Sequence, residues 1–283
     1  MVVDEIHSLA DPSRGAGLEM SLAKLLYSQQ APSAPGCSAG GRPPHGGPQI
    51  IGMSATMGGL ESLRGWLGAR LFLTNFRPVP LTEHAVFAGR VFRKRAPSAA
   101  SAAADADADA VCQPGGAGCP LEEERELRLS DPRLDRDRLV PLVAEVVAAG
   151  HSALVFCATQ RGAEACARLL TALLPRAVPP PAADLQRRRA GVLAGIRERL
   201  EGGEAGAELA AAVMAGVGFH HAGLTTQERE GVEAGYRSGA LQVLAATSTL
   251  AAGINLPARR VVLRSLRQGL GPVSRAQYLQ ARL

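Results

Sequence analysis

From residue 131 to residue 283, short apolar runs alternate with longer amphipathic stretches. A short apolar run bounded by polar residues predicts a buried strand, and apolar residues repeating every three or four positions predict a helix. We expect strands over residues 152–159, 216–221, 241–247 and 259–264, and helices over residues 137–149, 160–174, 184–200 and 226–236. This order predicts right-handed βαβ units and a parallel sheet, hence an α/β fold whose ligands bind beyond the carboxyl ends of the strands.

The beginning of the chain carries a weaker form of the same pattern. Met1–Val3 are apolar and read as the end of a buried strand that began before residue 1. The spacing of apolar residues predicts a helix over 14–27. Further along we expect a strand within 48–56, a helix over 59–67 and an extended stretch over 71–81.

Two low-complexity segments divide these blocks. Residues 28–48 are rich in Pro, Gly and Ser, and residues 95–124 include the repeat ADADADA. Such compositions cannot bury enough apolar surface to fold, so we expect disordered insertions or linkers. The predicted domains are therefore 1–90, with an insertion at 28–48, then a linker at 91–130, and a second domain at 131–283.

Composition restricts the class of protein further. The 46% hydrophobic content suffices for packed cores, and no apolar run reaches the roughly 18 residues of a membrane-spanning helix. The five cysteines are odd in number, and Cys112 and Cys119 lack a second ligand pair nearby, so we expect free thiols and no zinc site. The net charge of +5 permits a polyanionic partner. Pro257–Leu283 holds six arginines and no acidic residue, which fits either a nucleic-acid-facing tail or a solvated surface.

Polar clusters follow several of the expected strands. Asp4 and Glu5 come directly after the opening apolar residues, where one acid can hold Mg²⁺ and its neighbour can polarise a water that attacks a γ-phosphate. Taken alone, the same residues also fit an ordinary surface turn. Thr247–Pro257 places hydroxyls, a glycine and an amide after another strand, where backbone N–H groups can meet phosphates.

The adjacent histidines His220 and His221 allow a metal site or a structural role. Neighbouring residues on a strand point to opposite faces, so the two rings cannot readily bind one ion. We expect a structural or backbone-contacting role for one of them.

The strings DEIH, SAT, VFCAT, FHHAGLT and TSTLAAGINLPARR occur in this order. They resemble motifs II, III, IV, IVa and V of the Ski2-like branch of superfamily 2 helicases, and within it the polymerase-theta-like helicases and the helicase domain of DNA polymerase theta. The strings SRGAGLEMSLAKLLY and FRPVPL strengthen this resemblance. RNA-directed relatives show a motif V closer to ATLAWGVNLPAH, so TSTL and the continuation Ala258-Arg259-Arg260 favour the DNA-directed relatives.

The resemblance implies tandem RecA-like domains with parallel sheets, the first incomplete and the second nearly complete. It also implies ATP and Mg²⁺ as cofactors, movement from 3′ to 5′ on single-stranded or forked DNA, a role in DNA repair, and a place in the nucleus. Asp4 would bind Mg²⁺-ATP, Glu5 would activate water and His7 would couple the two domains. The other implied residues are Ser54 and Thr56 for coupling, Gly253 and Asn255 at the nucleotide cleft, and Thr247, Ser248, Thr249, Arg259 and Arg260 near nucleic acid.

The sequence departs from this family at both ends. It contains no G-x-x-x-x-G-K-[ST] loop, because neither Lys24 nor Lys94 follows a glycine, and Tyr278–Gln280 is not followed by the GRAGR arginines of motif VI. We therefore expect a truncated helicase without ATP turnover, in which residues 1–90 misfold or aggregate while the block from residue 131 folds alone. Two alternatives stay open: a nonenzymatic nucleic-acid-binding module with a RecA-like fold, and a piece of a Ski2-like RNA helicase.

Overall fold

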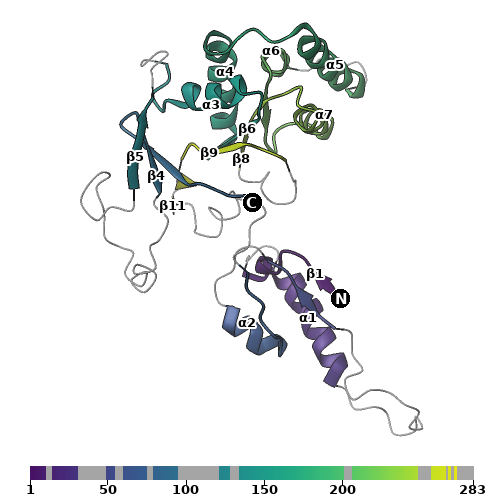
Figure 1. Ribbon diagram of the computed structural model, residues 1–283. Helices are drawn as coiled ribbons and strands as arrows, with labels where there is room; N and C mark the ends of the chain where they lie inside the picture. Colours follow the sequence, from purple (N-terminus) through teal and green to yellow (C-terminus); the bar gives the residue numbers. More distant parts are fainter. Residues whose placement is uncertain are drawn as a thin grey trace. The chain divides into compact units, whose positions relative to one another are not determined.

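The computed structural model describes residues 1–10, 15–30, 49–54, 60–74, 79–94, 121–127, 134–200, 206–247, 256–265, 267–268 and 271–272. The described residues up to 74 form one compact unit, and those from 79 to 272 form a second (Figure 1).

Within the described residues, the second unit is built on a four-stranded parallel sheet of β6 (Ala153–Cys157), β7 (Val217–His220), β8 (Val243–Thr247) and β9 (Arg260–Leu263). The strand order is β7-β8-β6-β9, and each pairing is parallel. All residues of β6, β7 and β8 are buried, which explains why these strands read as continuous apolar runs. The predicted α/β fold with a parallel sheet is confirmed.

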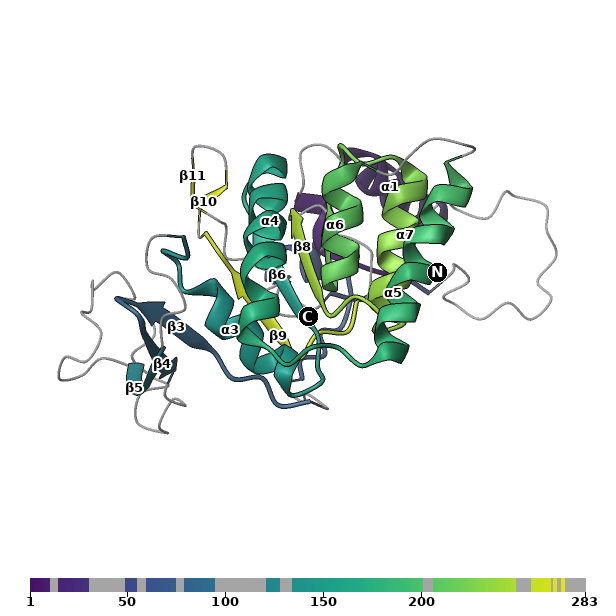
Figure 2. The same cartoon turned by 90° about the horizontal axis from the view of Figure 1, so that it is seen from above.

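Helices pack against this sheet and against one another (Figure 2). They are α3 (Leu139–Ala148), α4 (Gln160–Ala177), α5 (Ala183–Arg199), α6 (Ala207–Ala215) and α7 (Thr226–Arg237). Helix α4 packs along β6, β8 and β7, with α6 beside it on β7, while α5 packs against α6 and α7. The predicted helices fall on α3, α4, α5 and α7. Helix α6 was not predicted, because its sequence AELAAAVMA has small apolar residues almost throughout and so lacks a helical repeat.

A glycine allows α5 and α7 to approach closely. A Cβ atom on Gly231 of α7 would lie 2.3 Å from Cγ1 of Ile196 on α5, and Ile196 is fully buried. Glycine weakens a helix by about 1 kcal/mol relative to alanine. At this position the loss is offset by the close packing of the isoleucine.

The second unit also contains, in its described part, a three-stranded antiparallel sheet of β3 (His84–Phe87), β4 (Arg90–Lys94) and β5 (Leu121–Glu126). The prediction of disorder was wrong for residues 121–124, which lie in β5. Their charges are accommodated by cross-strand pairs such as Arg90–Glu123, at 3.2 Å, and the sheet is anchored where Val91 and Leu127 pack on Leu142 of α3. Lys94 pairs with Leu121, so the end of β4 lies beside the start of β5.

The first unit has a small core. Strands β1 (Val2–Val3) and β2 (Ile51–Gly52) pair in parallel, and they are accompanied by the 3-10 helix η1 (Ile6–Ala10) and the helices α1 (Gly15–Gln30) and α2 (Leu60–Leu67). Val3, Ile6 and Leu22 are buried together. Val2 is 61% exposed and Ile51 is 45% exposed, so the apolar residues of this strand pair are only partly covered. The predicted misfolding of residues 1–90 stays a prediction.

Among the described residues, no helix is both long and apolar enough to span a bilayer.

Candidate functional site

The carboxyl ends of the parallel strands form one edge of the second unit. The register aligns Cys157 with Thr247 and His220 with Ala246, while Phe156 aligns with Leu263. These strands therefore end along the same edge, which is where ligands bind in α/β sheets. We refer to it as the carboxyl edge.

Two helices begin at the carboxyl edge with capped N-termini. Thr159 Oγ1 accepts a hydrogen bond from the Gly162 N–H at 3.0 Å, which starts α4 directly after β6. Thr225 and Glu228 form a reciprocal capping box that starts α7 after β7. The caps leave other N–H groups of each first turn without an intrahelical partner, and a helix N-terminus carries a partial positive charge, so these two starts favour an anionic group at this edge. At α7 the Glu228 carboxylate already supplies one negative charge.

The two histidines of the FHHAGLT segment have different partners. His220 Nε2 lies 2.9 Å from Glu233 Oε1 on α7, whereas His221 Nε2 lies 3.2 Å from Glu164 Oε1 on α4. Burial lowers the pKa of His220, although Glu233 opposes this effect. The rings diverge as strand geometry predicts, and both are structurally engaged. Within the described ranges, no group of three or more His, Cys, Asp or Glu side chains could hold a metal ion.

Arg264 is a carboxyl-edge residue that the sequence showed only as one of the six arginines of Pro257–Leu283. Its backbone N–H donates to Phe156 O at 3.1 Å, and its Nε donates to Asp137 Oδ2 at 2.7 Å. Close by, a hydrogen bond from the buried Cys166 thiol lowers the pKa of Cys157, and the Arg264 charge acts in the same direction. The signal available in the sequence was the position of Arg264 directly after an apolar strand.

Thr247 ends β8 at the centre of the carboxyl edge, between the strands that lead to α4 and α7. It is buried. The other predicted residues of this segment, namely Ser248, Thr249, Gly253 and Asn255, lie outside the described residues. Their assignment stays a prediction.

Arg259 and Arg260 lie at the opposite edge, because Arg260 begins β9 and the strands are parallel. Arg260 donates to Leu142 O at 2.6 Å and to Glu145 Oε2 at 2.8 Å. Arg259 is exposed, and its backbone N–H donates to Ser152 O. The structure therefore does not bring these two arginines together with Thr247. Their assignment to nucleic-acid binding stays a prediction, and for Arg260 it competes with a visible structural role.

The predicted ATP-site residues lie in the first unit, also beyond strand ends. Asp4 and Glu5 form the exposed turn after β1, and Glu5 has a φ of 49°. Ser54 follows β2, and the N–H of Ile6 donates to Met53 O at 3.0 Å, so the two predicted motifs are neighbours on one sheet edge. The backbone of His7 lies in η1, whereas Thr56 lies outside the described residues.

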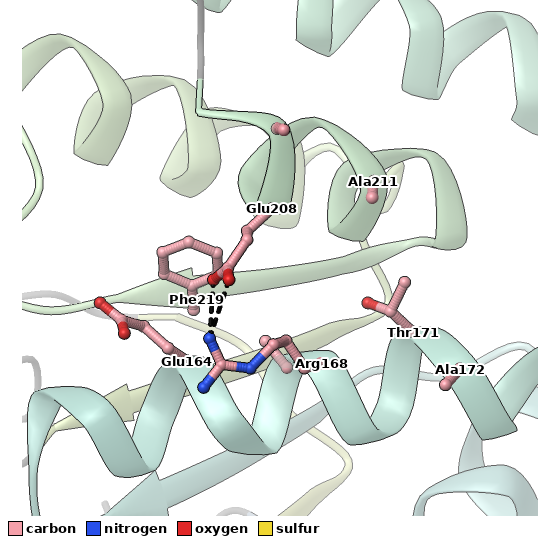
Figure 3. Close-up of a pocket in the computed structure, with 9 residues that line it drawn as sticks. Glu164, Arg168, Thr171, Ala172, Glu208, Ala211 and Phe219 are labelled. Atoms are coloured by element: carbon pink, nitrogen blue, oxygen red, sulfur yellow. Dashed lines mark hydrogen bonds and ion pairs between the residues drawn. The ribbon is translucent and has the colours of Figure 1, made fainter.

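A groove of about 340 Å³ lies between α4 and α6 (Figure 3). Phe219 and small residues line it, and Arg168 Nη1 donates to both carboxylate oxygens of Glu208 across it, at 2.9 Å each. Glu164, the partner of His221, is also part of its wall.

Comparison with known proteins finds similarity to helicases. Residues 186–282 match the family "Helicase conserved C-terminal domain", a RecA-like domain. The chain is 33% identical over 282 residues to human "Helicase POLQ-like", covering 99% of this chain and 22% of that protein. It is 34% identical over 285 residues to mouse "DNA polymerase theta", covering 94% of this chain and 10% of that protein.

The similarity extends to "ATP-dependent DNA helicase Hel308" of Methanocella arvoryzae, at 31% identity over 286 residues, 99% of this chain and 32% of that protein. The chain is thus homologous, along almost its whole length, to Ski2-like helicases of superfamily 2. It spans between about a tenth and a third of the length of the curated relatives it matches.

Proposed function

We propose that this chain is part of an ATP-dependent DNA helicase that moves 3′ to 5′ on single-stranded or forked DNA and acts in DNA repair in the nucleus. The observation that carries the proposal is the carboxyl edge, where β6, β7 and β8 end beside two capped helix N-termini. Backbone N–H groups at such positions can bind the phosphates of a nucleic acid whatever its base sequence.

The first unit would hold Mg²⁺-ATP through Asp4, with Glu5 beside it to orient water. The two carboxylates are adjacent and exposed, and Asp4 Oδ1 accepts the Glu5 N–H at 2.9 Å, which fixes the turn. Mg²⁺ usually takes one or two carboxylates and completes its shell with waters and phosphate oxygens. This pair fits that mode of binding, and the cation would neutralise charge on the phosphates.

The same proposal includes a limit on catalysis. Cradling the β- and γ-phosphates requires a glycine-rich loop with a lysine, and the 283 residues contain none. We therefore expect these residues alone to bind DNA without hydrolysing ATP.

The test measures the binding of labelled oligo(dT) and labelled oligo(U) to the 283-residue chain by fluorescence anisotropy, over a range of salt concentrations. We expect oligo(dT) to bind at least as well as oligo(U), with an affinity that falls steeply as salt rises because counterions are released. Added Mg²⁺-ATP should not be hydrolysed. Absence of oligo(dT) binding would contradict the proposal, and a clear preference for oligo(U) would favour an RNA helicase of the same branch.

A further inference from the structure

The turn of residues 221–225 connects β7 to α7 at the carboxyl edge, and His221 closes it twice. Its backbone carbonyl accepts the Leu224 N–H at 3.2 Å, and its ring Nδ1 accepts the Gly223 N–H at 3.1 Å. Side chain and backbone of one residue thus hold the same turn.

The imidazole ring itself is fixed by its surroundings. It is only 4% exposed and stacks on Phe219, with ring centroids 5.6 Å apart and planes inclined by 13°. Glu164 Oε1 lies 3.2 Å from Nε2, outside the direction of a straight hydrogen bond, so the carboxylate acts on the ring mainly through its charge. Glu164 and Phe219 appear together in Figure 3, on the wall of the groove between α4 and α6.

This arrangement selects one tautomer of His221. A nitrogen that accepts an N–H carries no proton, so the neutral ring must have its proton on Nε2. The negative charge of Glu164 beside Nε2 stabilises that form, as carboxylates commonly do for functional histidines.

The turn is also in contact with the start of α4. A Cβ atom on Gly223 would lie 3.0 Å from Gln160 Oε1 and 3.0 Å from His221 Nδ1. Two residues later Thr225 caps α7. A shift of His221 would therefore move the turn, its contact with α4 and the N-terminus of α7 together.

We propose that His221 is a positioning residue, which through Nδ1 holds the 221–225 turn in the conformation that meets the nucleic-acid backbone, while Glu164 sets the tautomer this requires. The inference rests on the proposed function, because it assigns the turn to the DNA-binding edge.

Two matched substitutions separate the ring nitrogens. In His221→Asn the amide oxygen can occupy the place of Nδ1 and accept from Gly223, whereas in His221→Gln the longer side chain directs its amide toward the place of Nε2. Both variants lose the stacking on Phe219 equally, so they differ mainly in the hydrogen bond to the turn.

The experiment compares the full chain and both variants by two readouts. Oligo(dT) affinity should fall about five- to tenfold in His221→Gln, the equivalent of one lost hydrogen bond. In His221→Asn it should stay within about twofold of the wild-type affinity. Hydrogen–deuterium exchange of the peptide covering residues 221–228 should be slow in the wild type and in His221→Asn, and fast in His221→Gln.

Equal exchange in both variants would overturn the anchoring role of Nδ1. Altered exchange with equal oligo(dT) affinity would overturn the positioning role in binding. If the wild-type chain binds no oligo(dT), the proposed function fails, while the exchange of the turn still decides whether His221 anchors it.

Discussion

Buried polar residues connect segments of this fold that are distant in sequence. Arg189 of α5 is only 5% exposed, and its guanidinium donates to Ala240 O and Met214 O at 3.3 and 3.2 Å and to Gln242 Oε1 at 3.2 Å. The sequence shows Arg189 only as one of three consecutive arginines. Its partners could not be predicted, because they come from the ends of other elements.

Replacing Arg189 should therefore destabilise the second unit. Arg189→Met keeps most of the side-chain volume but leaves the buried Ala240 carbonyl and the partly buried Met214 carbonyl without this donor, and we expect a loss of about 2–4 kcal/mol in the free energy of unfolding. The neighbouring Arg187→Met is the control, since Arg187 is 79% exposed and should change stability by less than about 0.5 kcal/mol. Urea denaturation measures both, and similar effects of the two substitutions would contradict the role of Arg189.

His220 predicts a dependence of stability on pH. Burial lowers its pKa in the folded chain below the ordinary value of 6.5, against the opposing effect of Glu233. Below pH 6.5 the unfolded chain then binds more protons than the folded one, so the contribution of His220 to stability is present above that pH and is lost as pH falls toward the folded pKa.

The test of this pH dependence compares the wild-type chain with the His220→Gln variant, whose side-chain amide can still donate a hydrogen bond to Glu233. Between about pH 7.5 and about pH 5.5, the free energy of unfolding should fall more steeply in the wild type than in this variant. If the free energy of unfolding changes with pH equally in the wild type and in His220→Gln, His220 has no such effect.

At the scale of elements, the sequence predicts best where burial produces a regular pattern. Strands β6 and β8 were recognised because both faces are covered and their residues are uniformly apolar. Strand β5 was missed because its sequence LEEERE is almost entirely charged, and it forms a strand through cross-strand ion pairs and the anchor Leu127. Pairing partners of this kind are a property of the folded chain and leave no repeat in the sequence.

The contact between α5 and α7 gives a prediction at this scale. Gly231→Ala would add a methyl group 2.3 Å from Ile196 Cγ1, so packing strain should outweigh the higher helix propensity of alanine and cost about 1–3 kcal/mol. Thermal or urea unfolding measures the change. In the double variant with Ile196→Ala, the two effects should be less than additive because the space for the new methyl group is restored. Strict additivity would show that the two side chains do not conflict.

At the scale of the whole molecule, the site was only partly predictable. The motif order pointed to the edges of two parallel sheets, and the structure places Asp4 and Ser54 on one edge in the first unit, and Thr247 on the carboxyl edge in the second. Sequence patterns could not predict which side chains lie close together. Arg260 and Thr247, for example, lie at opposite edges of the sheet. A basic run of residues does not reveal which cations are already paired within the fold.

The most direct measurement is hydrogen–deuterium exchange of the full chain with and without oligo(dT), because it locates the DNA on the molecule. We expect protection in peptides covering residues 157–162, 221–228 and 247–256, with little change around Ser152 and Arg259 at the opposite edge. Protection confined to the opposite edge or to the antiparallel sheet of β3, β4 and β5 would contradict the assignment of the carboxyl edge as the DNA-binding surface.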